Sequence, residues 1–192
     1  METSEKLTEQ QSLQIINDMI AAAKNNVKAD AFIFLLWGWL VFVASLGEFI
    51  MLLIGIKNPG WVWLLMPLGA VVTVIYVIKK RHTEKTKTYT NHFMKYIWIA
   101  FTVALFIIIA FSAIPALQIM PCIIILYGIG LFISGGALQF KPLILGGVFC
   151  WLCAIVGFQV QNEYILLVIA AAVLGGYIIP GYLLKQSNKN NV

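Results

Sequence analysis

Residues 101–110 read FTVALFIIIA, a run without charges that does not alternate between polar and apolar side chains. A strand of a membrane β-barrel would alternate over about ten residues, so the run indicates a helix. A helix needs about 20 mostly apolar residues to cross a bilayer. Six segments of that length occur in the chain: 31–54, 61–78, 97–114, 119–138, 142–158 and 164–184. The sequence therefore predicts an all-α fold, an integral membrane helical bundle of six transmembrane helices.

The composition of the 192-residue chain agrees with this fold. Hydrophobic residues make up 61% of the chain and charged residues 11%, against roughly 45–50% and about 25% in ordinary soluble domains. The mean hydropathy is +0.90. One soluble core does not hide so much apolar surface, so these values exclude a soluble enzyme, a nucleic-acid-binding domain and a disordered chain.

Helix-breaking residues stand between neighbouring spans. Pro59 follows the first span, Pro115 precedes the fourth, and Pro142 begins the fifth. Because short connections make consecutive helices antiparallel neighbours, we expect the spans to form hairpins. The predicted parts are an N-terminal amphipathic helix over 1–30, a transmembrane domain over 31–184 and a polar tail over 185–192.

Basic residues predict the orientation, because short cytoplasmic loops of membrane proteins are enriched in Lys and Arg. Six spans put both termini on one side of the membrane. That side collects twelve of the thirteen basic residues, and Lys57 alone lies on the other. We therefore expect a multi-pass protein of the cell (inner, cytoplasmic) membrane with both termini in the cytoplasm.

The first 30 residues are polar but carry an apolar stripe at helical spacing, formed by Leu13, Ile16, Ile20 and Val27. Such spacing is typical of an amphipathic helix. The helix has three possible neighbours: the lipid headgroup layer, the central loop of the chain, or a soluble protein partner or second copy. Its low basic content favours protein contact over anionic lipid.

The central loop between the second and third spans is strongly basic. Clusters of this kind next to a membrane attract anionic headgroups with about 1 kcal/mol per basic residue, although they also serve simply to orient the chain. The candidate lipid contacts are Lys79, Lys80, Arg81, Lys85 and Lys87. No aromatic stacking platform accompanies them, so we expect no nucleic-acid binding.

Glu48 is the one acid or base inside a predicted span. Intramembrane charges are costly and tend to mark ion pathways or proton relays. The residue lies nine positions before Lys57, about 13 Å at the helical rise, and hence in the outer half of the membrane. We expect either a transport role or a structural carboxylate that receives hydrogen bonds from Ser112, Gln118 or Gln159.

Cys150 and Cys153 form a C-x-x-C pair, and Cys122 is a third thiol. That spacing in thiol–disulfide enzymes places a nucleophile beside a resolving thiol. A simpler interpretation is a stripe of small side chains that lets membrane helices approach closely. The stripe consists of Gly146 or Gly147, Cys150, Ala154 and Gly157.

Two further groups of residues have structural interpretations. His82 and His92 lie ten residues apart without nearby cysteines or paired carboxylates, a poor pattern for a metal, so we expect no metal and no cofactor. Aromatic rings near span ends are typical interface anchors. Trp37, Trp39, Trp61, Trp63, Tyr96, Trp98, Tyr164, Tyr177 and Tyr182 belong to this group.

The segment Ser12-Leu13-Gln14-Ile15-Ile16-Asn17-Asp18-Met19-Ile20, with Leu36-Trp37-Gly38-Trp39 after it, resembles a group of small uncharacterised bacterial membrane proteins. In that group an amphipathic leader likewise precedes several spans. Gly135-Gly136-Ala137-Leu138 and Pro142-Leu143-Ile144-Leu145-Gly146-Gly147 are similar to the same group. The resemblance implies a bacterial cytoplasmic membrane and no particular activity.

Three functions follow from these features. We expect first a non-enzymatic subunit or membrane-bound regulatory partner that acts through the N-terminal helix. The alternative is a small-molecule or ion transporter or channel that uses Glu48. The third is a membrane thiol–disulfide oxidoreductase that uses Cys150 and Cys153.

Overall fold

The computed structural model describes the backbone of residues 9–83, 89–111, 115–160 and 162–189, and the side chains of 31–80, 94–111, 115, 117–160 and 162–187. Within these ranges every element is helical and no strand occurs. The α-helices are α1 (Glu9–Leu53), α2 (Leu65–Thr83), α3 (Tyr89–Phe111), α4 (Ala116–Ala137), α5 (Lys141–Gln159), α6 (Ile165–Val173) and α7 (Ile179–Lys189). Three short elements join them: η1 (Pro59–Leu64), η2 (Asn162–Tyr164) and η3 (Leu174–Ile178).

Six helical segments are long and apolar enough to cross a membrane, as predicted. They are Ala31–Leu53, Pro59–Lys80, Met94–Phe111, Leu117–Ala137, Lys141–Gln159 and Asn162–Ser187. The second segment opens with the 3₁₀ turn η1, where Pro59 supplies a fixed φ at the helix start. The sixth is interrupted by η3, a π-helical turn between α6 and α7.

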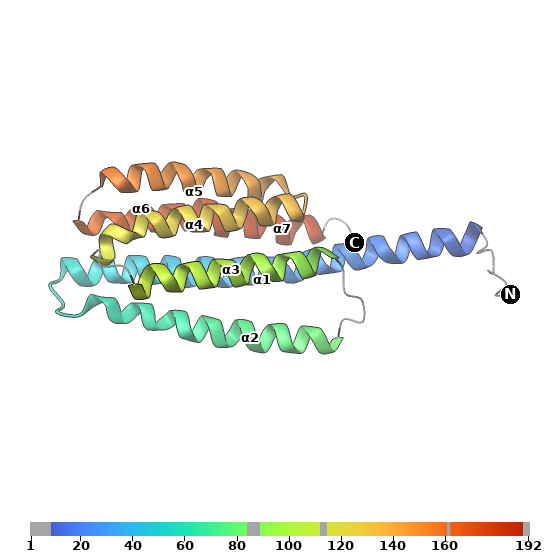
Figure 1. Cartoon of the computed structure of the whole chain (residues 1–192), viewed down its shortest axis with the longest axis horizontal. Helices are drawn as coiled ribbons and strands as arrows, with labels where there is room; N and C mark the ends of the chain where they lie inside the picture. Colours follow the sequence, from blue (N-terminus) through green and yellow to red (C-terminus); the bar gives the residue numbers. More distant parts are fainter. Residues whose placement is uncertain (1–8, 84–88, 112–114, 161, 190–192) are drawn as a thin grey trace.

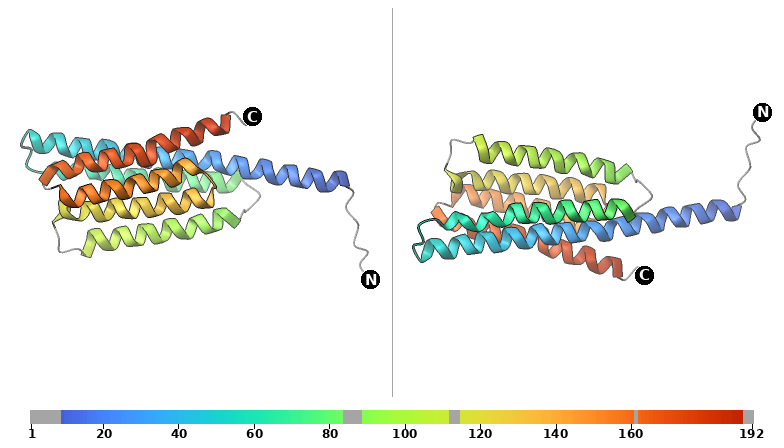
Figure 2. Two further views of the ribbon diagram at one scale, coloured as in Figure 1. Left: turned by 90° about the horizontal axis from the view of Figure 1, so that it is seen from above. Right: turned by 90° about the horizontal axis from the view of Figure 1, so that it is seen from below.

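The helices lie side by side along one axis, and the connections between them alternate between the two ends of the bundle (Figures 1 and 2). Helices α4, α5 and the segment from α6 to α7 pack together, and α1 lies against α6 and α7. Helix α2 packs on α1, and α3 packs on α4. The second and third spans therefore lie at the periphery, and few of their residues are buried.

Glycines bring the later helices into close contact. A Cβ atom added at Gly146 of α5 would lie 2.7 Å from the carbonyl oxygen of Gly176 in η3, and one at Gly147 would lie 2.8 Å from that of Gly128 in α4. Only glycine allows two backbones to approach in this way. The predicted small-residue stripe is confirmed, since the buried residues of α5 are Leu143, Gly146, Gly147, Cys150, Ala154 and Gly157.

Helix α1 is continuous from Glu9 to Leu53 and has 45 residues, about 68 Å at the helical rise. Its N-terminal part, coloured blue, extends beyond the end of the bundle (Figure 1). The predicted N-terminal helix thus runs into the first span without a break. The side chains of its apolar stripe, Leu13, Ile16, Ile20 and Val27, lie outside the described residues.

Replacing Gly146 by Val should destabilise the bundle, because the new side chain meets the backbone of Gly176 and the ring of Pro180. We expect a loss of about 1–3 kcal/mol in the free energy of unfolding, typical of overpacking, measured by denaturation in detergent. Gly136→Val is the matched control, since a Cβ at Gly136 meets nothing within 4 Å. Equal effects of the two substitutions would contradict the close helix contact.

Candidate functional site

The carboxylate of Glu48 has a hydrogen-bond partner on the neighbouring segment. The indole Nε1–H of Trp63 donates to Oε2 of Glu48, with the nitrogen and oxygen 2.6 Å apart. Trp63 belongs to η1, and its neighbour Val62 packs against Gly47 of α1. The chain turns back after α1, so η1 lies beside the last turns of that helix. This bond gives the carboxylate of Glu48 a local partner within the described part of the chain.

The partner differs from the ones expected for Glu48. Gln118 and Gln159 are exposed, and neither side chain donates to the carboxylate. Ser112 lies outside the described residues. The sequence predicts that Trp61 and Trp63 are both interface anchors, but the two differ in the structure. Trp61 is 68% exposed, whereas Trp63 is half-buried and packs against the core.

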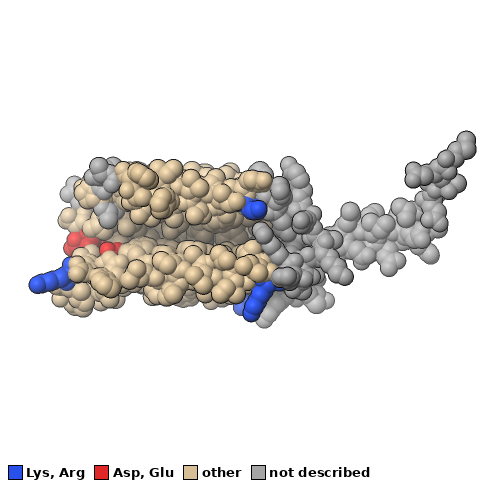
Figure 3. Space-filling view, turned by 60° about the horizontal axis from the view of Figure 1, so that its bottom comes forward, with Lys and Arg blue, Asp and Glu red and all other residues tan. Residues whose placement is uncertain are grey.

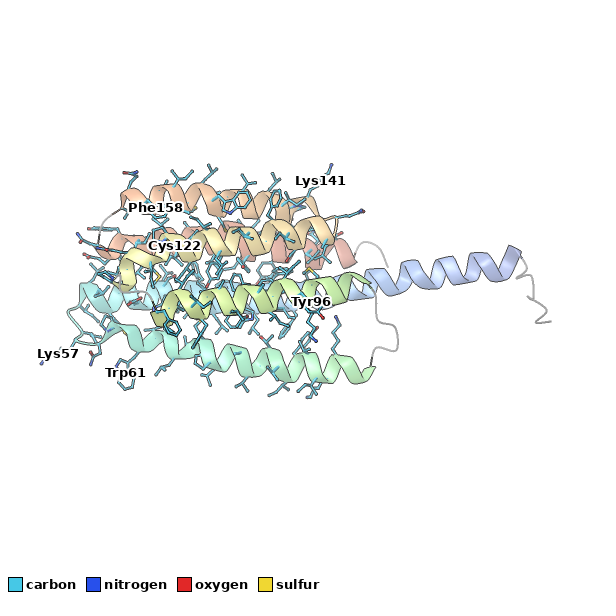
Figure 4. All side chains as sticks on the ribbon, in the orientation of Figure 1. Lys57, Trp61, Tyr96, Cys122, Lys141 and Phe158 are labelled. Carbon is cyan, nitrogen blue, oxygen red and sulfur yellow. The ribbon has the colours of Figure 1, made fainter. Side chains whose placement is uncertain are left out.

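Among the described residues, the number of lysines differs between the two ends of the bundle. Lys57 and Trp61 lie at one end, and Tyr96 and Lys141 lie toward the other (Figure 4). Figure 3 shows a furrow between α2 and α3, with acidic side chains at the Lys57 end and Lys or Arg side chains at both ends. The described lysines at the end opposite Lys57 are Lys79, Lys80, Lys95, Lys141 and Lys185. The side chains of Arg81, Lys85 and Lys87 lie outside the described residues.

The three cysteines have different surroundings. Cys150 is completely buried, and its thiol donates to the carbonyl oxygen of Ala172 at 3.5 Å. Cys153 is half-buried and Cys122 is exposed on α4. All three are free thiols. A thiol–disulfide enzyme needs a reachable thiolate, and Cys150 instead fills the space beside Gly176, so its small size explains its position.

Metal ligands do not gather in the described part of the chain, where no group of three His, Cys, Asp or Glu residues occurs that would hold a metal ion. The side chains of His82 and His92 lie outside that part.

An aromatic cluster fills the centre of the bundle, and it was not predicted. The ring of Tyr177 lies 6.1 Å from that of Phe34 and 5.6 Å from that of Tyr127, centroid to centroid. Trp98 contacts Phe34, and Phe101 stacks on Tyr127 at 5.6 Å. The cluster joins α1, α3, α4 and η3.

The prediction that Tyr177 is an interface anchor is therefore wrong, because this residue is 4% exposed. Trp98 was also predicted to be an anchor, and its ring packs against the core. Tyr177 lies in the middle of the last span rather than at its end, because the helical segment continues to Ser187. Its hydroxyl is buried and has no hydrogen-bond partner, and the hydroxyl of Ser134 on α4 is in the same state. In the sequence, the pair Gly175-Gly176 directly before Tyr177 was the one feature that could have indicated a close helix contact at this point.

Comparison of the chain with protein-family models, with curated proteins and with solved structures found no match.

Replacing Trp63 by Phe should remove the hydrogen bond to Glu48 while keeping an aromatic ring. Since hydrogen bonds between membrane helices are worth about 0.6–2 kcal/mol, we expect a loss of that order in the free energy of unfolding in detergent. Trp61→Phe is the control, because this exposed ring should change stability by less than about 0.5 kcal/mol. A Trp63→Phe protein as stable as the Trp61→Phe protein would show that the bond does not form in the membrane protein.

Proposed function

We propose that this chain is a non-enzymatic, multi-pass membrane protein that binds a soluble protein partner through its N-terminal helix. Its six spans are antiparallel hairpins in the bacterial cytoplasmic membrane, with both termini in the cytoplasm. The observation that carries the partner proposal is the continuity of α1 from Glu9 to Leu53. The arrangement of the six spans and of the charges supports the membrane topology.

The membrane topology rests on helix length and on the distribution of lysines. The spans contain 18 to 26 residues, and about 20 are needed to cross a bilayer core. Lys57 lies at one end of the bundle, and five described lysines lie at the other. The positive-inside rule makes the lysine-rich end cytoplasmic. Anionic headgroups then contact the basic residues around Lys79 and Lys80.

Cysteine labelling tests this topology. Asn58→Cys, beside Lys57, should react with a membrane-impermeant maleimide in intact cells, and Gln186→Cys, after the last span, should react only after permeabilisation. Both positions are exposed, and the unsubstituted chain reports the background from the native thiols. Labelling of Gln186→Cys in intact cells, or of both positions together, would contradict the proposed orientation.

The apolar stripe of the N-terminal helix continues a face that is buried inside the bundle. A helix advances about 100° per residue, so residues of one unbroken helix can be placed on faces by number alone. Leu13, Ile16, Ile20 and Val27 fall within the same arc of about 80° as four buried residues of the first span. Those four residues are Ala31, Phe34, Gly38 and Val41.

Helix α7 covers this face inside the bundle but ends before most of the stripe. Gly38 of α1 lies against Ile178, and Leu35 lies against Gly181, so α1 and α7 run in opposite directions. Helix α7 ends at Lys189, eight residues after Gly181, which is about level with Val27. The stripe residues from Leu13 to Ile20 lie about 10–21 Å further along the helix axis. We propose that a partner covers them.

The same geometry argues against a second copy as the partner. If two stripes faced each other in a parallel pair, the first span of one copy would continue into the space that α6 and α7 of the other copy occupy. A helix from a soluble domain does not continue into the membrane, so it can lie on the stripe directly beyond the end of α7. We therefore propose a soluble helix with an apolar face as the partner.

Site-specific photocrosslinking tests the partner proposal. A photoreactive amino acid at Leu13, Ile16 or Ile20 should crosslink one protein of defined mass, whereas the same group at Gln14 or Asn25, on the opposite face, should not. Face-dependent crosslinking supports the proposal because a freely accessible helix reacts from both faces. Crosslinks between two copies of this chain, to lipid alone, or equally from both faces would contradict it.

A further inference from the structure

A furrow runs between α2 and α3 along the surface of the bundle (Figure 3). The two helices follow each other in the chain, but α2 packs on α1 and α3 packs on α4, and they do not pack against each other along their lengths. Few residues of either helix are buried. With the spans in a bilayer, the furrow is therefore open toward the surrounding lipid.

The contacts of α3 show which of its flanks faces the furrow. The ring of Trp98 reaches α1, where it contacts Phe34, whereas Phe101 stacks on Tyr127 of α4. At about 100° per residue, three exposed residues lie on the side of Trp98 that is turned away from Phe101. These residues are Lys95, Thr102 and Phe106. They form the α3 wall of the furrow.

The other wall belongs to α2. Tyr76 packs on Phe32 of α1, and Thr73 accepts a hydrogen bond from Trp37. Viewed along the axis of α1, Trp37 lies between Phe32 and Phe34. Since Phe34 is the residue that α3 contacts, the side of Thr73 turned away from Tyr76 faces α3. That side carries Ala70, Val74 and Val77.

The polar side chains in the middle of the furrow are engaged within the bundle. The hydroxyl of Thr73 donates to the carbonyl oxygen of Gly69, and that of Thr102 donates to the carbonyl oxygen of Trp98, each at 2.8 Å. The indole N–H of Trp37 is bonded to Thr73. The other side chains named for the two walls at this depth are apolar, so the middle of the furrow suits a hydrocarbon chain.

Two lysines lie at one end of the furrow, one from each helix. Lys95 lies about one turn before Trp98, and Lys80 lies about one turn after Tyr76. Because Trp98 and Tyr76 contact neighbouring residues of α1, the two lysines lie at similar levels, at the end opposite Lys57. Basic pockets between membrane helices bind the headgroups of anionic lipids.

We propose that one anionic phospholipid binds in the furrow between α2 and α3, with its phosphate between Lys80 and Lys95 and an acyl chain along Val74 and Phe106. The negative phosphate offsets two like charges that neighbouring helices bring to one level. The site rests on the membrane insertion proposed above and does not depend on the N-terminal partner.

A helix from a second copy fits this furrow less well. Close helix contacts in membranes depend on small residues, as at Gly146 and Gly176. The walls of the furrow instead carry the larger side chains of Val74, Val77 and Phe106. A flexible acyl chain adapts to such walls, and its headgroup supplies the negative charge that complements the lysines.

Lipid retention by the full-length protein tests the headgroup site. The delipidated protein is incubated in detergent with phosphatidylglycerol or with phosphatidylethanolamine of the same acyl chains, and bound lipid is counted by native mass spectrometry. We expect one phosphatidylglycerol to be retained in preference. Lys95→Gln should weaken its binding about fivefold, the contribution of one basic residue near a membrane. Lys141→Gln, which removes the same charge at the same end but far from α2 (Figure 4), should leave the binding unchanged.

Two alanine variants show whether the acyl chain lies in the furrow. Ala70→Phe adds a ring to the α2 wall and should cause a loss of bound phosphatidylglycerol, although both lysines remain. Ala100→Phe is the matched control, because Ala100 is exposed on the opposite side of α3, and it should retain the lipid.

Three results would overturn the site: equal retention of the two lipids, equal effects of the two lysine variants, or equal effects of the two alanine variants. A dimer that is lost in the Ala70→Phe protein would assign the furrow to a second copy and would also overturn it. These outcomes are distinct from those of the photocrosslinking test, since the lipid can bind whether or not a partner crosslinks to the N-terminal helix.

Discussion

The contact between Gly146 of α5 and Gly176 of η3 is the constraint on which the rest of the bundle depends. At this point two backbones touch, and a Cβ atom on either glycine would meet the other chain segment. The contact holds α5 against the last span where the helix takes its π form. Cys150, one turn further along α5, fills the remaining space beside Gly176. Because η3 is held in this position, Tyr177 points into the interior toward α1 and α4.

The peripheral helix α2 is attached by different means. Few residues of α2 are buried. Side-chain hydrogen bonds connect α2 and η1 to α1. The Trp37 indole donates to the hydroxyl of Thr73 at 3.1 Å, and the Trp63 indole donates to Glu48. Apolar contact gains little over lipid inside a membrane, whereas hydrogen bonds between helices are worth about 0.6–2 kcal/mol. The two tryptophans therefore hold the second span in register with the first, and Glu48 serves as an acceptor.

How much of the candidate site could be predicted differs from residue to residue. Glu48 was recognisable because it is the one ionisable residue in an apolar run. Its partner Trp63 was not, since the bond spans fifteen residues and the turn η1, and tryptophans near span ends usually anchor the interface. Tyr177 also resembled an interface anchor, because it is an aromatic residue near the end of a predicted span. Its burial depends on helices distant in sequence, because Phe34 of α1 and Tyr127 of α4 pack against its ring.

The amino-acid sequence by itself determined that the chain is helical, that it has six segments apolar enough to cross a membrane, and that the small side chains of α5 form one buried face. These properties depend on the hydropathy and spacing of residues within one segment, so they can be read along the chain. Only the tertiary structure decided that α5 meets the last span at a π-turn, that Trp63 is the partner of Glu48, and that a tyrosine hydroxyl is buried at the centre. Such features depend on distances between separate helices, and hydropathy carries no information about which helices become neighbours.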